Sequence, residues 1–244
     1  MLGGRPGSPV GPGRGAYDHS VSPRAEWDER FSVADFVFGS APNVFVPDLA
    51  AGLPPGRALD LGAGEGRHAV WLAQQGHQVT AVDWSPVGFA KGRSLAAAAG
   101  VEVDWVVADL AGWEPEPEAY DLVLLTYFQV VPDLRRRVHH QAVRALAPGG
   151  RLVLVAHHVD NISRGVGGPQ DPGRCYNEAT LRADFPGLEI LRCEAVLRTV
   201  GAGTPEQAEA IDVILVGVRG MNGDERVGDE DAWEGTVGEG LASG

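Results

Sequence analysis

One stretch of sequence decides the fold of this chain: Arg57-Ala-Leu-Asp-Leu-Gly-Ala-Gly-Glu-Gly-Arg-His68. Its first residues form a short, largely apolar run that predicts a buried strand, and glycine then occupies every second position from 62 to 66. A helix is expected to begin at about Glu65 and to end at Gly76. Alternate glycines let the backbone turn sharply and let a ligand lie directly against it, while the helix N-terminus adds free amide donors. The stretch therefore predicts a strand–turn–helix unit that binds a nucleotide-type ligand.

The spacing of the three glycines indicates which nucleotide is bound. A dinucleotide site has the pattern Gly-x-Gly-x-x-Gly, with the pyrophosphate at the helix N-terminus. Here the third glycine comes one residue early, and Arg67 occupies the position that the dinucleotide pattern would fill. Glu65 would also place a carboxylate beside the pyrophosphate, and like charges repel. A ligand without phosphate that carries an ammonium and a sulfonium group would instead be attracted to Asp60 and Glu65, and S-adenosylmethionine is such a ligand.

The pattern Asp60-x-Gly62-x-Gly64-x-Gly66 resembles motif I of class I S-adenosylmethionine-dependent methyltransferases. The resemblance covers residues 24–219 and includes the Pro148-Gly149-Gly150 turn. Residues 60–73 and 167–176 are most similar to bacterial small-molecule members of the tellurite-resistance and thiopurine-methyltransferase-like type. The stretch after the sixth strand departs from that pattern, so the resemblance does not predict which residues form the acceptor pocket. The alternative interpretation of motif I is a glycine-rich turn without a ligand.

The order of apolar runs predicts a Rossmann-like, doubly wound α/β fold. Its seven-stranded sheet should be mostly parallel, with the last strand antiparallel and helices on both faces. The expected strands are residues 57–61, 78–82, 103–108, 120–125, 151–156, 188–199 and 211–218. The expected helices are residues 65–75, 87–99 and 134–146. In the last of these helices, the run 135–137 and the pair His139-His140 are expected on a solvated face.

Acidic side chains follow neighbouring strands and complete a predicted cofactor site. Asp83 lies about twenty residues after the first glycine, where an acid can accept both ribose hydroxyls, although dinucleotide sites use an acid there too. Trp84 either lies on the adenine face or is an aromatic residue at the edge of the core. The resemblance implies that Asp109 bonds the adenine amino group; the alternative is a turn cap. The complete predicted cofactor-binding set is Asp60, Gly62, Ala63, Gly64, Gly66, Arg67, Asp83, Trp84, Asp109, Leu110 and Thr126.

Transfer of a methyl group from a sulfonium is an in-line displacement, for which a protein mainly supplies orientation and excludes water. No metal is required, and the sequence has no cluster with metal-ligand spacing. A base is needed only for a protonated acceptor, and the candidates are His157 or His158, then Tyr127. Alternatively, these side chains only line the pocket or bond the backbone.

Two segments are expected to cover this site. Residues 160–177 form a long glycine-rich loop, predicted to be a lid with Cys175 and Tyr176 facing the cavity near His157, unless the loop is simply disordered. The segment that contains Trp27 and Phe31 resembles one that folds over the cofactor in small-molecule methyltransferases. The alternative for this segment is an amphipathic helix that packs on the sheet.

Composition bounds the remaining possibilities. Residues 1–16 and 221–244 are predicted to be disordered tails around a methyltransferase domain of residues 17–220. The net charge of −13 argues against nucleic acid as a partner. The absence of a long apolar run argues against a membrane span, and two cysteines fit a reducing, cytoplasmic location.

The predicted function is methyl transfer from S-adenosylmethionine to a small-molecule acceptor. Two alternatives stay open: a regulatory protein that binds S-adenosylmethionine without turnover, and a dinucleotide-dependent oxidoreductase. The sequence does not predict the accepting atom or the oligomeric state.

Overall fold

The computed structural model describes residues 23–221, and the two predicted tails lie outside these residues except for Met221. Its centre is a seven-stranded sheet in the order β3-β2-β1-β4-β5-β7-β6. The strands are β1 (Arg57–Leu61), β2 (Gln78–Asp83), β3 (Asp104–Val107), β4 (Tyr120–Thr126), β5 (Leu146–His157), β6 (Leu188–Val200) and β7 (Ala208–Arg219). The helices are α1 (Pro23–Phe31), α2 (Val46–Leu49), α3 (Arg67–Gln74), α4 (Pro86–Ala99), α5 (Pro132–Ala145), α6 (Asn161–Arg164) and α7 (Glu178–Asp184), with a 3-10 helix, η1 (Pro172–Arg174).

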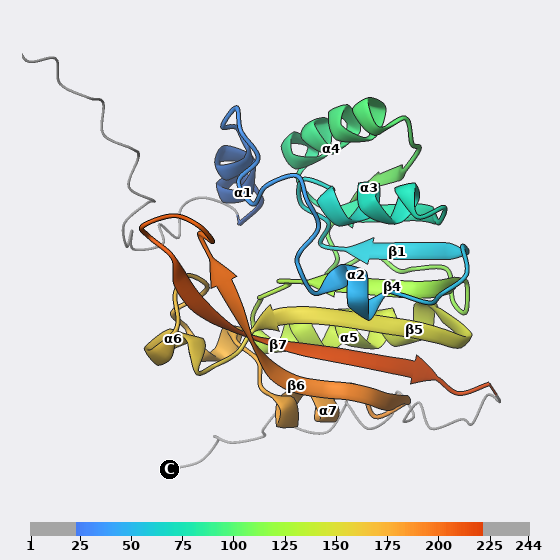
Figure 1. Cartoon of the computed structure of the whole chain (residues 1–244). Coiled ribbons are helices and arrows are strands. Elements are labelled where there is room, and N and C mark those ends of the chain that lie inside the picture. Colours follow the sequence, from blue (N-terminus) through green and yellow to red (C-terminus); the bar gives the residue numbers. More distant parts are fainter. Residues whose placement is uncertain (1–22, 222–244) are drawn as a thin grey trace, which may run out of the picture.

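The doubly wound topology predicted from the sequence is confirmed. Strands β3, β2, β1, β4 and β5 pair in parallel, and β7 is antiparallel to both β5 and β6. Figure 1 shows β1, β4, β5, β7 and β6 following one another across the sheet. Because β6 and β7 form the expected hairpin, the last strand brings its N-terminal half to the carboxyl ends of the parallel strands.

Helices cover both faces of the sheet, and each face has its own hydrophobic core. Helices α2, α3 and α4 pack on one face, where Leu72 and Phe89 meet Leu122 and Leu124 of β4. Helices α5 and α7 pack on the other face, around Val123 and its alternating neighbours in β4. Alternate residues of β4 therefore enter opposite cores, as its nearly continuous apolar sequence requires.

Two boundaries differ from the prediction for local reasons. Helix α3 begins at Arg67 rather than at Glu65, because Gly66 has a φ of 78° and acts as a left-handed N-cap. Strand β5 begins five residues early, at Leu146, because its first part pairs with Tyr120 before a shift in register.

The expectation of a solvated face on α5 is wrong for Arg135 and His139, which are both buried. They lie in the same helical stripe as Val138 and Ala142, and this stripe faces the core. Asp184 of α7 balances them: its Oδ2 is 3.2 Å from Nε of Arg135 and 3.1 Å from Nδ1 of His139. The charges of these side chains predicted that they are exposed, but the carboxylate of Asp184 on a distant helix allows them to be buried.

Among the described residues no group of acidic, histidine and cysteine side chains could hold a metal ion.

Candidate active site

The turn between β1 and α3 has the conformation that its glycines predict. Gly62, Gly64 and Gly66 have φ values of 71°, 58° and 78°, in the left-handed region that favours glycine. The amides of Gly62 and Ala63 both donate to the carbonyl of Val82, which fixes the turn against β2. Aromatic side chains occupy the space that a Cβ would take at these glycines: Phe128 lies at Gly62, Phe31 at Gly64 and Trp105 at Gly66.

Asp60, the last polar residue of β1, is an unusual buried acid. It is fully buried, and neither carboxylate oxygen has a hydrogen-bond partner within the described residues. Burial, and then the charge of Asp83, raise the pKa of Asp60 to about 7. A buried carboxylate is costly unless it is paired, so this side chain suits a cationic group such as the ammonium of S-adenosylmethionine.

Asp83 is held at the tip of β2 and aimed at the glycine turn. Its Oδ2 accepts a hydrogen bond of 2.9 Å from the amide of Gly64, and its Oδ1 accepts one of 2.9 Å from Ser85. Burial is the main cause that raises the pKa of Asp83, and the two amides act in the opposite direction. A carboxylate can accept further bonds beyond these two, so the position fits the predicted ribose anchor. Trp84 is half-buried beside it.

Three further residues predicted to bind the cofactor, Asp109, Leu110 and Thr126, differ in burial: the first is exposed and the other two are buried. Asp109 is exposed, and its Oδ1 accepts a bond of 2.9 Å from the amide of Ala111, which is a turn-capping arrangement. Leu110 is buried in the core. Thr126 is buried at the end of β4, with Oγ1 3.0 Å from Nδ1 of His68. A contact between Asp109 and adenine stays a prediction.

Glu65 does not have the role predicted for it. Its carboxylate is buried, lies 2.8 Å from the ammonium of Lys91, and accepts a bond of 2.9 Å from the amide of Val37. The expectation that Glu65 attracts a cationic ligand is wrong, because Lys91 already balances its charge.

The N-terminal segment packs over the glycine turn rather than on the sheet. Helix α1 contacts α4, and Phe31 lies against Gly64 and Gly88. Beyond α1, Arg67 donates to the carbonyl of Phe38, and the amide of Asn43 donates to Nε2 of His68 over 3.1 Å. The interpretation of this segment as a cover is favoured over that of a helix on the sheet.

A second polar group, which we call the Asp212 cluster, consists of Asn43, Tyr127, His157, Arg198 and Asp212. Oδ2 of Asp212 accepts bonds from the hydroxyl of Tyr127 (2.8 Å) and Nε of Arg198 (2.6 Å). Oδ1 of Asp212 lies 3.0 Å from Nδ1 of His157. Asn43 donates to the hydroxyl of Tyr127 over 2.8 Å, which joins the cluster to the N-terminal segment. The cluster thus gathers four strands at one edge of the sheet.

Sequence reasoning identified His157 and Tyr127 but missed Asp212 and Arg198. The available signal was one acid inside the apolar run of β7, since a fully buried aspartate needs partners. Burial opposes ionisation of Asp212, but the adjacent His157 ring, Arg198 and Tyr127 hold its pKa below the usual range. Burial, followed by the charge of Asp212, raises the pKa of Tyr127. Tyr127 is therefore a donor at neutral pH and not a base.

The loop after β5 is ordered differently from the prediction. Tyr176 is buried in the core of the α5 face, where its hydroxyl donates to the carbonyl of Phe128 over 2.6 Å. Cys175 is also buried, and its Sγ is 3.8 Å from the carbonyl of Pro169. The expectation that Cys175 and Tyr176 face the cavity near His157 is wrong. Gly168 packs against the His157 ring instead.

His158, the other candidate base, holds the same loop in place. Its Nε2 is 3.2 Å from a carboxylate oxygen of Glu178, and its Nδ1 accepts a bond of 3.1 Å from the amide of Asp160. Both ring nitrogens are engaged, so His158 has a structural role.

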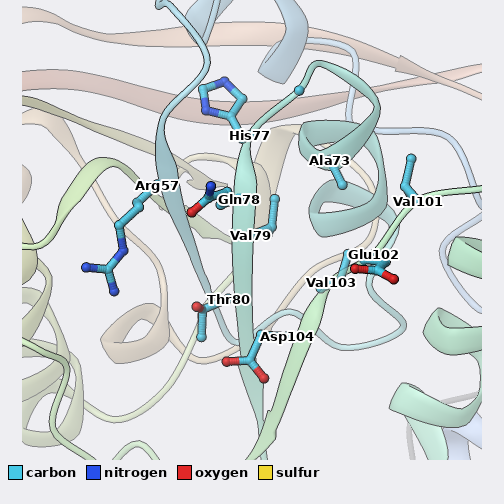
Figure 2. Close-up of a pocket in the computed structure, with 11 residues that line it drawn as sticks. Arg57, Ala73, His77, Gln78, Val79, Thr80, Val101, Glu102, Val103 and Asp104 are labelled. Atoms are coloured by element: carbon cyan, nitrogen blue, oxygen red, sulfur yellow. The ribbon is translucent and has the colours of Figure 1, made fainter.

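A hollow of about 770 Å³ lies at the opposite edge of the sheet, at the amino ends of β2 and β3. Figure 2 shows Arg57, His77, Glu102 and Asp104 spread around it. Ligands of doubly wound sheets bind at the carboxyl ends of the strands. The hollow is therefore not the candidate site.

Several known proteins are similar in sequence to this chain. Residues 58–150 match the family model described as a methyltransferase domain. A ribosomal RNA small subunit methyltransferase C of Chromohalobacter salexigens is 34% identical over 162 residues, which cover 57% of this chain and 46% of that protein. A demethylmenaquinone methyltransferase of Thermus thermophilus is 35% identical over 111 residues, which cover 44% of this chain and 50% of that protein. The chain thus spans about half the length of these curated relatives.

A solved structure extends the likeness beyond the matched residues. This structure is described as that of the conversion of a disulfide bond into a thioacetal group during echinomycin biosynthesis. Its sequence is 26% identical to this chain, and the two superpose with a TM-score of 0.59 over 75% of this chain and 84% of that chain. Residues 58–150 are thus similar to a methyltransferase domain, and the sheet order and the glycine turn agree with this likeness. S-adenosylmethionine is the cofactor of this domain. Within residues 23–221, no helix is both long enough and apolar enough to cross a membrane.

Proposed function

We propose that the chain transfers the methyl group of S-adenosylmethionine to a small-molecule acceptor. The observation that carries this proposal is Asp60, a fully buried carboxylate without a hydrogen-bond partner in the described residues, beside a turn of three left-handed glycines. The relatives are named for a quinone-type compound and for ribosomal RNA. The net charge of −13 favours a small molecule, because binding to a phosphate backbone depends on clustered basic residues.

Each part of the site has a proposed role. Asp60 bonds the ammonium of the cofactor, the backbone from Gly62 to Gly66 lies against it, and Asp83 accepts the ribose hydroxyls. The bound cofactor supplies a methyl group already activated by a sulfonium. The N-terminal segment excludes water from that group, and the Asp212 cluster lies where the acceptor would bind.

Finer assignments belong to the same proposal. Residues 60–73 and 167–176 support a place near the tellurite-resistance and thiopurine-type small-molecule enzymes. The free thiols of Cys175 and Cys193 support a cytoplasmic location. The methyltransferase domain is assigned to residues 17–220, between two tails.

Calorimetry with the full chain tests the cofactor assignment. S-adenosylmethionine should bind and NAD should not, and Asp60→Asn should weaken binding of S-adenosylmethionine roughly tenfold or more, because the paired charge is lost. Equal affinity for NAD would contradict the proposal. Release of S-adenosylhomocysteine with small acceptors, but not with ribosomal RNA, separates methyl transfer from a regulatory role and from action on RNA.

A further inference from the structure

His157 is partly buried, and its ring is held at one nitrogen, unlike three of the buried histidines. His68, His139 and His158 each have partners at both ring nitrogens. In His157, only Nδ1 has a polar partner within residues 23–221, namely Oδ1 of Asp212 at 3.0 Å. This is an ion-pair distance rather than a well-aligned hydrogen bond, and both atoms are buried without any other hydrogen-bond partner in the described chain.

This arrangement fixes where the ring carries its proton. Asp212 is fully buried and stays ionised, since Arg198 and Tyr127 also donate to it. A carboxylate beside Nδ1 favours the tautomer with the proton on that nitrogen. The lone pair of the neutral ring is then on Nε2, on the side where the ring meets Gly168.

Gly168 leaves room for the His157 ring in its present position. A side-chain carbon at this position would lie 2.5 Å from Cδ2 and 2.9 Å from Nε2 of His157, closer than any stable contact. At Gly167, which has nearly the same φ (69° against 73°), an added carbon would meet nothing within 4 Å. Gly168 therefore packs directly against the His157 ring, and a side chain at this position would displace the ring.

From this geometry, together with the proposed function, we propose that the acceptor is a small phenol or enol and that Nε2 of His157 removes its hydroxyl proton. Asp212 is a positioning residue: it holds the ring and balances the imidazolium. The acceptor oxygen forms a bond to the methyl carbon, the sulfur–carbon bond breaks and leaves its electron pair on sulfur, and the hydroxyl proton moves to Nε2. The products are a methyl ether and S-adenosylhomocysteine, and the proton passes from imidazolium to solvent.

The need for a base selects acceptors that lose a proton on methylation, and a hydroxyl group is the member of this class that we propose. Pyridine-type nitrogens and thioethers accept a methyl group without losing a proton, so a histidine–aspartate pair would add nothing for them. The charged or titratable groups next to His157 are Asp212 from β7 and Tyr127 after β4, and Arg198 from β6 and Arg67 from α3 act in turn on Tyr127. Tyr127 is held protonated and the arginines are cations, so His157 is the base of this group.

A panel of probes tests the acceptor class. The full chain is incubated with S-adenosylmethionine and with phenol, 2-naphthol or acetylacetone, and in parallel with pyridine, quinoline or dimethyl sulfide. Release of S-adenosylhomocysteine is expected with a member of the first set and not with the second. Binding of the cofactor without turnover on the protic probes, or turnover on the aprotic ones, would overturn the acceptor class while leaving the cofactor site standing. Failure to bind S-adenosylmethionine would overturn the proposed function itself.

Variants test the roles of the pair on the protic probe that reacts fastest. His157→Gln should lower kcat roughly 100-fold, the usual contribution of a general base. Asp212→Asn should lower kcat and move the acid limb of the kcat/KM profile to lower pH, because imidazolium loses its counter-charge. If Asp212 were merely structural, the variant would lose stability and rate while the limb stayed in place.

A pair of glycine variants keeps the inference testable even if Asp212→Asn does not fold. Gly168→Ala should lower kcat/KM on the phenol probe roughly tenfold or more, with affinity for S-adenosylmethionine unchanged, because the added methyl group displaces the His157 ring. Gly167→Ala carries the same backbone strain but meets no neighbour, so it is the matched control. Equal loss of activity in both variants would overturn the role of Gly168.

Discussion

At the scale of single residues, Asp60 combines burial, charge and a ligand site. The predicted motif placed it at the end of β1, and the structure adds that its carboxylate has no partner within residues 23–221. The cofactor-free protein must therefore bear the cost of this acid, which makes its stability sensitive to pH.

The pH dependence of that cost can be measured. An aspartate has an ordinary pKa of 3.8, whereas burial raises the pKa of Asp60 to about 7. The folded state holds the proton more tightly between these values, so the contribution of Asp60 to the free energy of unfolding falls as pH rises from about 4 to about 7 and is constant above. In Asp60→Asn this contribution disappears. Without cofactor, the melting temperature of the variant relative to that of the natural protein should therefore rise with pH up to about pH 7. Melting temperatures that change with pH in parallel would contradict the prediction.

Asp83 gives a second prediction at this scale. Charge-assisted bonds to two ribose hydroxyls would each contribute roughly 1.5–3 kcal/mol. Asp83→Ala should therefore weaken binding of S-adenosylhomocysteine tenfold or more, as measured by calorimetry. The substitution also removes the bonds to Gly64 and Ser85 and can disturb the turn. A ligand that lacks the ribose hydroxyls therefore serves as the control. The natural protein should lose affinity for a 2′,3′-dideoxyribose analogue, while the variant should bind both ligands alike.

At the scale of elements, the N-terminal segment illustrates what the sequence could and could not predict. Its aromatic residues indicated packing, but not onto which surface. The answer depends on Glu65, Lys91 and His68, which reach it across long separations in the chain. Such contacts follow from the packing of α3 and α4 and have no local signature.

The ion pair between Glu65 and Lys91 should stabilise this element measurably. Its side chains are 4% and 16% exposed. A double-mutant cycle with Glu65→Gln and Lys91→Met should give a coupling of about 1–2 kcal/mol by urea unfolding, since the pair is largely shielded from water. The same variants should speed dissociation of S-adenosylmethionine.

A pair on the surface serves as the matched control for this cycle. Arg57 and Glu116 lie 2.7 Å apart, close to the 2.8 Å of the first pair, but they are 42% and 62% exposed. Their coupling should stay below about 1 kcal/mol. Similar coupling in both pairs would mean that the first does not anchor the segment.

At the scale of the whole molecule, the sheet was predictable because each strand and its following turn carry local signals. Apolar runs end in Asp83 and Thr126, and glycine ends α4 at Gly100. The Asp212 cluster was not predictable in the same way. Its members come from distant parts of the chain, and the pairing of β5 with β7 places His157 beside Asp212. Register is a property of the folded sheet, so a lone aspartate in β7 indicated a partner without identifying it.

The predicted tails should contribute little to the stability of the molecule or to its affinity for the cofactor. Both hydrophobic cores are built from residues 31–216, so a chain reduced to residues 23–221 keeps every core contact that the structure describes. The glycine turn, Asp60, Asp83 and the Asp212 cluster also lie within it. Truncation should therefore leave the melting temperature and the affinity for S-adenosylmethionine nearly unchanged. Scanning calorimetry and titration of the truncated and full chains make the comparison, and a large fall in either quantity would show that one tail docks on the domain.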